Sequence, residues 1–230
     1  MLKKIITEDG SISFYNTEIE ESYHSKSGAL EEALKKHVEP SNIKTKKDFT
    51  IIGDLFFGLG YNTIVAIKTF LENNPEGIIQ VFAFENDLSI IQKLNEIKLP
   101  EEYEPYKNII IELIDEKNKR LQKEDYDLFV YESEQIIISL YLGDIKKTLS
   151  LISDESFEIV FFDPFSPKKQ GLFWSETFLE EVYRVMDKNS VLTTYSCAKK
   201  VRENMTRVGF KIFDGPIIGR KSPGTIARKD

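Results

Sequence analysis

The sequence contains very few of the side chains that form disulfides or bind zinc. Its 230 residues include one cysteine, Cys197, and two histidines. A single cysteine excludes an internal disulfide, so the chain is compatible with a reducing compartment. Three cysteine and histidine side chains in total also disfavour a structural zinc site. We therefore predict a cytoplasmic protein without a bound metal.

Long apolar runs are missing as well. No stretch approaches the ~20 apolar residues of a membrane-spanning helix, and no signal-peptide pattern opens the chain. The composition, with 41% hydrophobic, 12% aromatic and 30% charged residues, is that of a soluble globular protein with enough apolar side chains for a core. The sequence thus predicts no membrane partner and one large domain, with or without a small extension.

The net charge of −7 is distributed unevenly along the chain. Residues 1–163 carry 18 basic and 31 acidic side chains, whereas residues 164–230 carry 13 basic and 7 acidic ones. A basic third on an otherwise acidic protein indicates a polyanionic partner that contacts one face. An uneven, solvated surface would give the same counts, so charge alone leaves the partner open.

Strand and helix patterns alternate from Phe49 onward, and this alternation predicts a doubly wound α/β sheet with helices on both faces and an antiparallel C-terminal edge. Residues 126–142 are predicted to add a hairpin, and residues 109–114 suit either a strand or a helix. The remaining apolar runs typical of strands are 78–84, 157–162, 191–195, 209–213 and 225–228. Helical spacing follows Asn62 and recurs at 87–97, 144–151, 176–186 and 199–207.

The first 45 residues have a different pattern. Residues 11–15 alternate like a short strand, and the apolar residues of 28–38 fall on one helical face. Ser27 is the expected N-cap of that helix and Pro40 its expected end. We therefore predict an N-terminal extension at 1–45 that packs on a main domain at 46–230.

The segment 49–70 is the most informative part of the chain. An apolar run ends at Asp54 and is followed by Gly58, Gly60 and Asn62. Strand, glycine turn and helix in this order present a nucleotide-sized ligand at the carboxyl edge of a parallel sheet, where glycines let the backbone approach closely. No Gly-Lys-Ser/Thr follows, which excludes a Walker-type loop. The acid and the asparagine are more typical of the S-adenosylmethionine loop of class I methyltransferases, although a tight turn between core elements has the same glycine spacing.

Four acids stand at or just after the ends of successive strands: Asp54, Glu85, Asp144 and Asp163. These ends share one edge of a parallel sheet, so the carboxylates converge on one crevice. Glu85 lies 25 residues after Gly60, close to the interval of ~20 residues at which an acid meets ribose hydroxyls. Asp144 can accept from an adenine amino group, and Asp54 with the glycine turn would face the methionine part. Each acid taken singly also suits an exposed helix N-cap.

The sequence FFDPFSPKKQGLFW around Asp163 combines an acid with prolines and aromatic residues. Pro164 and Pro167 stiffen the loop, while Phe165 and Trp174 supply flat apolar surface. An acid in such a pocket would hold a substrate amine and favour its ammonium form. Because methyl transfer needs the neutral amine, Asp163 would orient the amine or relay its proton. We predict Asp163, Pro164 and Phe165 as the catalytic group.

These motifs resemble the methyltransferase half of the bifunctional tRNA enzyme MnmC and, more closely, stand-alone forms that lack the flavin oxidase half. The resemblance covers most of the chain and is carried by DGSISFYNTEIEESYHSKSGALEEA, GDLFFGLGYNT, FAFEND, LYLGDIKKTL, FFDPFSPKKQGLFWSETF, TTYSCAKKVRENMTRVGF and GPIIGRKSPGTIA. It implies a Rossmann-like class I methyltransferase sheet, S-adenosyl-L-methionine as the cofactor, and N-methylation of 5-aminomethyl(-2-thio)uridine at the tRNA wobble position. No flavin is expected, so the aminomethyl substrate would come from elsewhere.

The same resemblance implies roles for individual residues. Glu31 would lie near the donor, Glu85 on its ribose, Asp144 near its adenine and Asp163 at the amine. Phe56 departs from the family pattern, because many relatives have the first glycine of the loop there.

The basic C-terminal third agrees with a tRNA partner bound through its anticodon region. Lysine and arginine side chains would position the RNA through its phosphates, and a flipped-out uridine would stack on aromatic side chains. The residues predicted to contact tRNA or its base are Lys168, Lys169, Trp174, Tyr195, Lys199, Lys200, Arg202, Arg220 and Lys221.

Two other functions stay open at this point. An aminopropyltransferase of the spermidine-synthase type would share the sheet and the ribose acid, but its loop would carry more acids than the single Asp163 here. A nucleotide-sensing or RNA-binding module would not need the strand-end acids.

Overall fold

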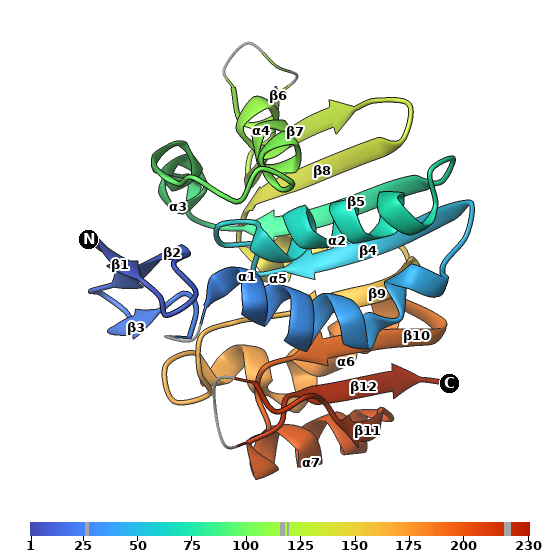
Figure 1. The fold of residues 1–230 in the computed structure, drawn as a ribbon. Helices are drawn as coiled ribbons and strands as arrows, with labels where there is room; N and C mark the ends of the chain where they lie inside the picture. Colours follow the sequence, from blue (N-terminus) through green and yellow to red (C-terminus); the bar gives the residue numbers. More distant parts are fainter. Residues whose placement is uncertain (26–27, 116–117, 119, 219–221) are drawn as a thin grey trace.

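The computed structural model describes residues 1–25, 28–115, 118, 120–218 and 222–230. Its main part is a nine-stranded mixed sheet in the order β11-β12-β10-β9-β4-β5-β8-β7-β6 (Figure 1). The strands are β4 Phe49–Leu55, β5 Ile78–Glu85, β6 Arg120–Gln122, β7 Tyr126–Glu132, β8 Ile136–Gly143, β9 Phe157–Phe162, β10 Met186–Thr194, β11 Lys211–Asp214 and β12 Thr225–Lys229.

The five central strands, β10, β9, β4, β5 and β8, pair in parallel. At one edge β7 and β6 add antiparallel strands, and at the other β12 and β11 do the same. The predicted α/β sheet, its antiparallel C-terminal edge and the hairpin at 126–142 are therefore present. The chain runs outward from β4 to β5 and β8, then returns to the other side of β4 as β9 and β10. Open α/β sheets bind ligands at such a reversal of strand order.

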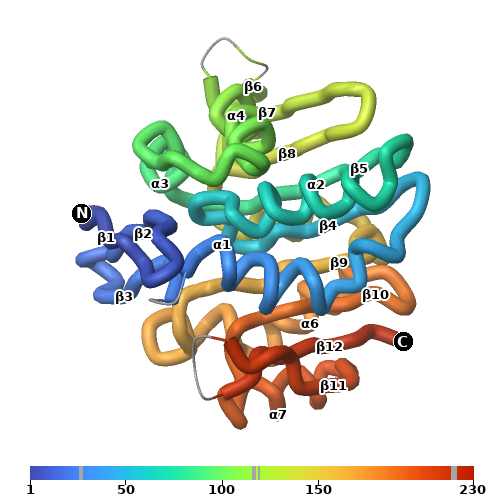
Figure 2. The backbone as a smooth tube through the Cα atoms, viewed as in Figure 1, coloured from blue at the N-terminus to red at the C-terminus, as the bar shows by residue number. Residues whose placement is uncertain are grey.

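Alternation along the strands gives the sheet two apolar faces. In β9, Ile159 and Phe161 belong to one buried cluster, whereas Val160 and Phe162 belong to the other. Helices cover both faces, as predicted (Figure 2). The first face packs against α2 Tyr61–Asn73, α3 Leu88–Gln92 with the 3₁₀ turn η4 Lys93–Glu96, and α4 Glu104–Leu113, and the second against α5 Ile145–Leu149, α6 Glu176–Val185 and α7 Lys199–Val208.

The N-terminal residues form a small antiparallel sheet followed by a helical segment. The sheet consists of β1 Leu2–Ile6, β2 Ile12–Asn16 and β3 Glu21–Ser22, and the helical segment of α1 Ala29–Glu32, the π-helix η1 Ala33–Val38 and the 3₁₀ turns η2 Glu39–Ser41 and η3 Ile43–Thr45. The small sheet, blue in Figure 1, lies beyond the carboxyl ends of the central strands. The predicted division between residues 45 and 46 falls between η3 and β4 and stays a proposal.

The end of this helical segment differs from the prediction. Pro40 does not stop the winding but lies in the first turn of η2, where a proline is tolerated because the first N–H groups of a helix have no intrahelical partner. The segment changes direction at Asn42, which has a left-handed φ of 60°. The predicted N-cap, Ser27, lies outside the described residues.

Residues 109–114, which suited either element, belong almost entirely to α4. Pro105 lies in the first turn of this helix, and Ile110 and Leu113 face the core three residues apart. One-sided burial at helical spacing therefore outweighs the strand preference of three consecutive isoleucines. Within the described ranges, the structure contains no helix of the length and apolarity needed to traverse a membrane.

Candidate active site

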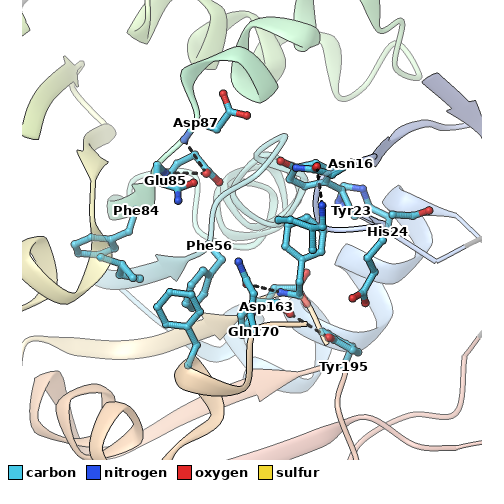
Figure 3. A pocket seen from close by; sticks show the side chains of 18 of the residues that line it. Asn16, Tyr23, His24, Phe56, Phe84, Glu85, Asp87, Asp163, Gln170 and Tyr195 are labelled. Carbon is cyan, nitrogen blue, oxygen red and sulfur yellow. Dashed lines mark hydrogen bonds between the residues drawn. The ribbon is translucent and has the colours of Figure 1, made fainter. Parts of the chain in front are cut away.

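A cavity of about 550 Å³ opens at the carboxyl edge of the sheet, beside the reversal between β4 and β9. Its walls come from the ends of the central strands, from the loop after β9, and from the N-terminal segment between Asn16 and Ser25. Figure 3 shows strand-end and N-terminal side chains facing one another across it. The volume lies within the range of cofactor and small-molecule sites.

Glu85, at the end of β5, lines this cavity and holds the glycine turn against it. Its Oε2 accepts from the N–H of Gly58 at 2.8 Å, and its Oε1 accepts from the N–H groups of Asn86 and Asp87 at 2.8 and 3.1 Å. Burial raises the pKa of this carboxyl above its ordinary value, against the effect of these N–H donors. A carboxylate offers about four acceptor positions, so Glu85 keeps acceptor capacity for a ligand hydroxyl.

Asp54 lies behind the glycine turn and is not part of the cavity wall. Its side chain is fully buried, and Thr63 Oγ1 donates to Oδ2 at 2.6 Å. Asn62 lies one residue earlier, in the same first turn of α2. Burial raises the pKa of Asp54 to about 7 despite its hydrogen bonds with Thr63. Asp54 thus connects β4 to α2 through Thr63 and does not reach the cavity wall, where the predicted contact with the methionine part of a donor would lie.

The two glycines of the turn both have left-handed backbone conformations, with φ 56° at Gly58 and 73° at Gly60. A Cβ on Gly60 would lie 2.5 Å from the Phe57 ring, and one on Gly58 would lie 3.3 Å from the Tyr23 ring. Packing inside the protein therefore accounts for both glycines, in addition to the ligand approach that the sequence suggested.

Phe56 lines the cavity with a left-handed φ of 71°, a conformation that is uncommon outside glycine. Its ring meets those of Phe173 and Phe162 edge-on, with centroids 4.7 and 5.6 Å apart. The residue that departs from the family pattern thus joins the glycine turn to the short helix after the β9 loop, η5 Gly171–Trp174.

Asp144 follows β8 and is both a residue of the cavity wall and a helix N-cap. It lines the cavity, and its Oδ1 accepts from the N–H of Lys146 at 3.0 Å, which makes it the N-cap of α5. Glu85, Asp144 and Asp163 therefore line one cavity, as the strand-end argument predicted.

Asp163 begins the loop after β9, and its side chain is 15% exposed at the cavity wall. Pro164 and Phe165 line the same wall, and the Phe165 ring meets Tyr23 edge-on at 4.9 Å. The Nε2 of His37 lies 3.7 Å from Asp163 Oδ1. The predicted catalytic group is thus assembled at the cavity, between the sheet and the N-terminal extension.

Two aromatic residues predicted to stack on a base have other contacts in the structure. Trp174 is 2% exposed, and its Nε1–H donates to the carbonyl of Phe165 at 2.8 Å. The hydroxyl of Tyr195 donates to the carbonyl of Pro164 at 3.0 Å, while its ring lines the cavity (Figure 3). Trp174 is too buried to stack on a base, so its role is to hold the loop, and Tyr195 holds the same loop from the other side.

Of the neighbouring pair Glu31 and Glu32, it is Glu32 that lines the cavity, whereas Glu31, the predicted donor contact, is exposed and does not line it. Glu32 accepts from Lys36 Nζ at 2.6 Å and from the N–H of Ser25 at 2.8 Å. Burial alone would raise the pKa of Glu32, but Lys36 and these hydrogen bonds outweigh it and lower the pKa to about 2. The i, i+4 spacing of Glu32 and Lys36 on the buried helix face was the available sequence signal.

Both histidines lie close to the cavity and were not predicted to be functional. His24 lines the wall, with Nδ1 2.9 Å from Ser13 Oγ, and His37 is fully buried, with Nδ1 3.4 Å from Thr193 Oγ1. Burial lowers the pKa of each to about 4, so both are neutral at pH 7. The sequence offered no signal for them, since each reaches the site through tertiary packing.

The predicted RNA-binding residues differ in how far they are free to bind a partner. Lys168 and Lys200 are exposed, Lys199 is exposed with its Nζ 3.8 Å from Glu203 Oε1, and Lys169 pairs with Glu20 at 2.8 Å. Arg202 donates within the protein to Asp214 Oδ1, Thr225 Oγ1 and the carbonyl of Gly224, so its guanidinium is already occupied. Arg220 and Lys221 lie outside the described residues.

Residues 104–230, more than half of the chain, match a family of S-adenosyl-L-methionine-dependent methyltransferases. The chain belongs to this family, and the protein is an enzyme that uses S-adenosyl-L-methionine. The predicted class I methyltransferase fold and its cofactor are thereby confirmed.

Within this class, the chain is similar to MnmC proteins, which confirms the resemblance stated from its motifs. It is 25% identical to the tRNA 5-methylaminomethyl-2-thiouridine biosynthesis bifunctional protein MnmC of Leptospira interrogans, over 94% of this chain and 34% of that protein. The crystal structure of MnmC2 from Aquifex aeolicus matches with a TM-score of 0.84 and 32% identity, covering 99% of this chain and 70% of that one.

Two further findings concern the lengths of the relatives and a second similar fold. The chain spans 34% to 58% of the length of the first curated relatives that it matches. The spermidine synthase of Thermotoga maritima matches with a TM-score of 0.58 at 10% identity, over 100% of this chain and 72% of that one. That likeness concerns the fold alone.

Proposed function

We propose that this enzyme methylates the aminomethyl group of 5-aminomethyl(-2-thio)uridine at the wobble position of tRNA, giving 5-methylaminomethyl(-2-thio)uridine. The observation that carries the proposal is one cavity with two kinds of acid. Glu85 and Asp144 lie at the strand ends beside the glycine turn, and Asp163 lies in an aromatic, proline-containing loop across from them. The names of the MnmC relatives point to the same modification pathway.

The donor side of the cavity suits S-adenosyl-L-methionine, which supplies an electrophilic methyl group on a sulfonium sulfur. Glu85 keeps acceptor capacity for ribose hydroxyls after binding three backbone N–H groups. Asp144 presents a carboxylate oxygen beside Gly143 and Ile145, where an adenine amino group would donate. Asp54, buried and bonded to Thr63, keeps the turn in place without touching the ligand.

The substrate side is suited to an alkyl amine. Such an amine, like that of lysine, is mostly protonated at neutral pH, and the carboxylate of Asp163 would hold the ammonium group. Asp163 or water would take one N–H proton before attack, because only the neutral amine has a lone pair that can accept the methyl group that S-adenosyl-L-methionine would supply. Alignment of amine and methyl group by the braced loop contributes most of the rate.

The proposal of a nucleic-acid partner is based on the basic C-terminal third and on exposed lysines at the same edge of the sheet. Lys199 and Lys200 begin α7, a few residues after Tyr195 at the cavity wall. Lys168 lies in the loop that Asp163 begins. Phosphate contacts by these lysines would place the anticodon arm so that its wobble base enters the cavity.

The test is incubation of the purified protein with isotope-labelled S-adenosyl-L-methionine and tRNA from a strain that accumulates 5-aminomethyluridine, followed by mass spectrometry of the nucleosides. Label in 5-methylaminomethyluridine supports the proposal. The matched control is Asp163→Asn, which keeps the size of the side chain. We expect it to lower turnover by about 100-fold while donor affinity stays the same. Label that appears in no nucleoside, or in another one, would refute the proposed reaction.

Aminopropyl transfer to a small polyamine is the alternative, and the acidic cavity wall favours it, because Glu18, Glu21 and Asp87 join the strand-end acids there. Against it, Glu21 bonds the Asp163 loop and Glu32 is paired with Lys36, so much of this charge is already engaged. Incubation of the protein with decarboxylated S-adenosylmethionine and putrescine separates the two functions. Only an aminopropyltransferase would form spermidine in this assay.

A further inference from the structure

The N-terminal sheet bonds directly to the loop that carries Asp163. The carboxylate of Glu21, in β3, accepts from the backbone N–H of Ser166 at 3.1 and 3.2 Å and from the Ser166 hydroxyl at 2.7 Å. These residues are 145 positions apart in the sequence, so the contact exists only because the extension folds over the carboxyl edge of the sheet. Hydrogen bonds to an ionised carboxylate are about twice as strong as neutral ones.

Two neighbouring contacts join the same two segments. Lys169 Nζ lies 2.8 Å from Glu20 Oε2 at the exposed rim, and the ring of Tyr23 meets Phe165 edge-on at 4.9 Å. Residues 20, 21 and 23 thus contact residues 169, 166 and 165 in turn. Glu21 and Tyr23 hold the loop from the extension on one side, the Glu20–Lys169 pair being exposed at the rim, while Tyr195 and Trp174 hold its carbonyl groups on the other.

We propose that Glu21 is a positioning residue: through Ser166 it fixes the Asp163–Phe165 turn so that both side chains face the cavity. Its own carboxylate takes no part in the chemistry. The identity of the positioned substrate rests on the proposed function, whereas the holding of the loop does not. The extension is therefore part of the machinery that aligns the amine, in addition to being a wall of the cavity.

Trp174 provides a readout of the loop that needs no substrate. It is the single tryptophan of the chain, it is 2% exposed, and its indole N–H donates to the carbonyl of Phe165, the residue before Ser166. Release of Ser166 should loosen this segment and expose the indole. Quenching of tryptophan fluorescence by acrylamide then measures the accessibility of Trp174 directly.

The test compares Glu21→Ala, Glu21→Gln and, as a control, Glu20→Gln. Alanine removes the acceptor, so Trp174 should become more accessible to acrylamide and turnover should fall by about 10- to 100-fold, the size of loss that misalignment by about 1 Å causes. Glutamine can accept from the Ser166 N–H and donate to its hydroxyl, so the Glu21→Gln variant should keep a protected Trp174 and most of the turnover. Glu20→Gln removes only an exposed ion pair and should match the wild type in both measurements.

Three results would overturn the proposal. If Glu21→Ala leaves both Trp174 quenching and turnover at wild-type values, the contact does not hold the loop. If Glu21→Gln loses as much turnover as Glu21→Ala while Trp174 stays protected, the carboxylate acts chemically. If donor affinity falls together with turnover in Glu21→Ala, the residue serves the donor side. Wild-type protein that fails to methylate aminomethyluridine refutes the proposed function alone, because the quenching series still decides the loop-holding role.

Discussion

Replacement of Lys36 by methionine should destabilise the protein by about 3 kcal/mol at pH 7, because it leaves the buried carboxylate of Glu32 without its cation. The side chains of Lys36 and Glu32 are only 1% and 6% exposed, and their charged atoms are 2.6 Å apart. Methionine keeps the length of the lysine stem, so the change removes the charge with little effect on packing.

Two independent arguments give the same magnitude. The pKa of Glu32 falls from 4.5 to about 2 in the folded protein, which at about 1.4 kcal/mol per pKa unit corresponds to about 3 kcal/mol. Removal of one partner from a buried ion pair typically costs ~3–5 kcal/mol. For a chain of this size, a loss of about 3 kcal/mol lowers the melting temperature by about 6–12 °C.

The pH dependence supplies a second check. A carboxyl group whose pKa is lowered on folding contributes stability fully above its unfolded value of 4.5 and loses that contribution as the pH falls towards 2. Without Lys36, burial should hold the pKa of Glu32 above 4.5, so the difference in unfolding free energy between wild type and Lys36→Met should begin to shrink above pH 4.5 and keep shrinking towards pH 2. Urea unfolding followed by circular dichroism at several pH values measures it.

Two variants make this prediction refutable. Lys35→Met removes the neighbouring, more exposed pair with Glu39 and should cost less than about 1 kcal/mol. The double variant Glu32→Gln, Lys36→Met leaves no unpaired charge and should recover part of the loss. A cost below about 1 kcal/mol for Lys36→Met, or a double variant no more stable than the single one, would show that Glu32 does not depend on Lys36.

Three further predictions concern the turn, the histidines and the RNA surface. Gly60→Ala should cost about 1–3 kcal/mol and weaken donor binding in calorimetry, because of its φ of 73° and the adjacent Phe57 ring; an unchanged melting temperature would contradict this. The two histidines are neutral in the fold, with pKa values lowered to about 4. Stability should therefore fall as the pH drops from about 6.5 towards 4, where the unfolded chain binds the extra protons, and His37→Gln should flatten this part of the curve. Charge reversal of Lys199 and Lys200 to glutamate should weaken tRNA binding and its salt dependence without changing donor affinity, whereas Lys188→Glu, near the start of β10 and away from the cavity, should do neither.

The strand-end acids show what sequence patterns can establish. Apolar runs that end in an acid placed Glu85, Asp144 and Asp163 at one edge, because parallel strands leave no other arrangement. The same reasoning misjudged Asp54, since the position at which a strand ends does not determine whether its last acid turns towards the ligand or towards the following helix. In this protein the hydroxyl of Thr63, in α2, donates to Asp54 and turns it towards the helix.

The N-terminal half of the site depended on information that the patterns do not carry. Periodicity predicted the helix at 28–38. Glu31 and Glu32 are adjacent in it, however, and the apolar pattern did not show that Glu31 is exposed whereas Glu32 is buried. Tyr23 and His24 enter the cavity from an irregular segment, so no period points to them. Trp174 looked like a stacking surface because its loop contains glycine and proline, yet its indole is held by Phe165 beneath that loop.

The small N-terminal sheet lies beyond the carboxyl ends of the central strands (Figure 1). The N-terminal extension and the main domain therefore both line the cavity in which the reaction takes place. Strands β4 to β12 alone would retain every hydrogen-bonded neighbour of the main sheet, but the residues between Asn16 and Ser25 and the side chain of Glu32 would be absent from the cavity. Exchange of the first 45 residues between relatives should therefore transfer substrate preference without changing the strand-end residues on the donor side of the cavity. This segment is thus a suitable target for redesigning the specificity of the enzyme.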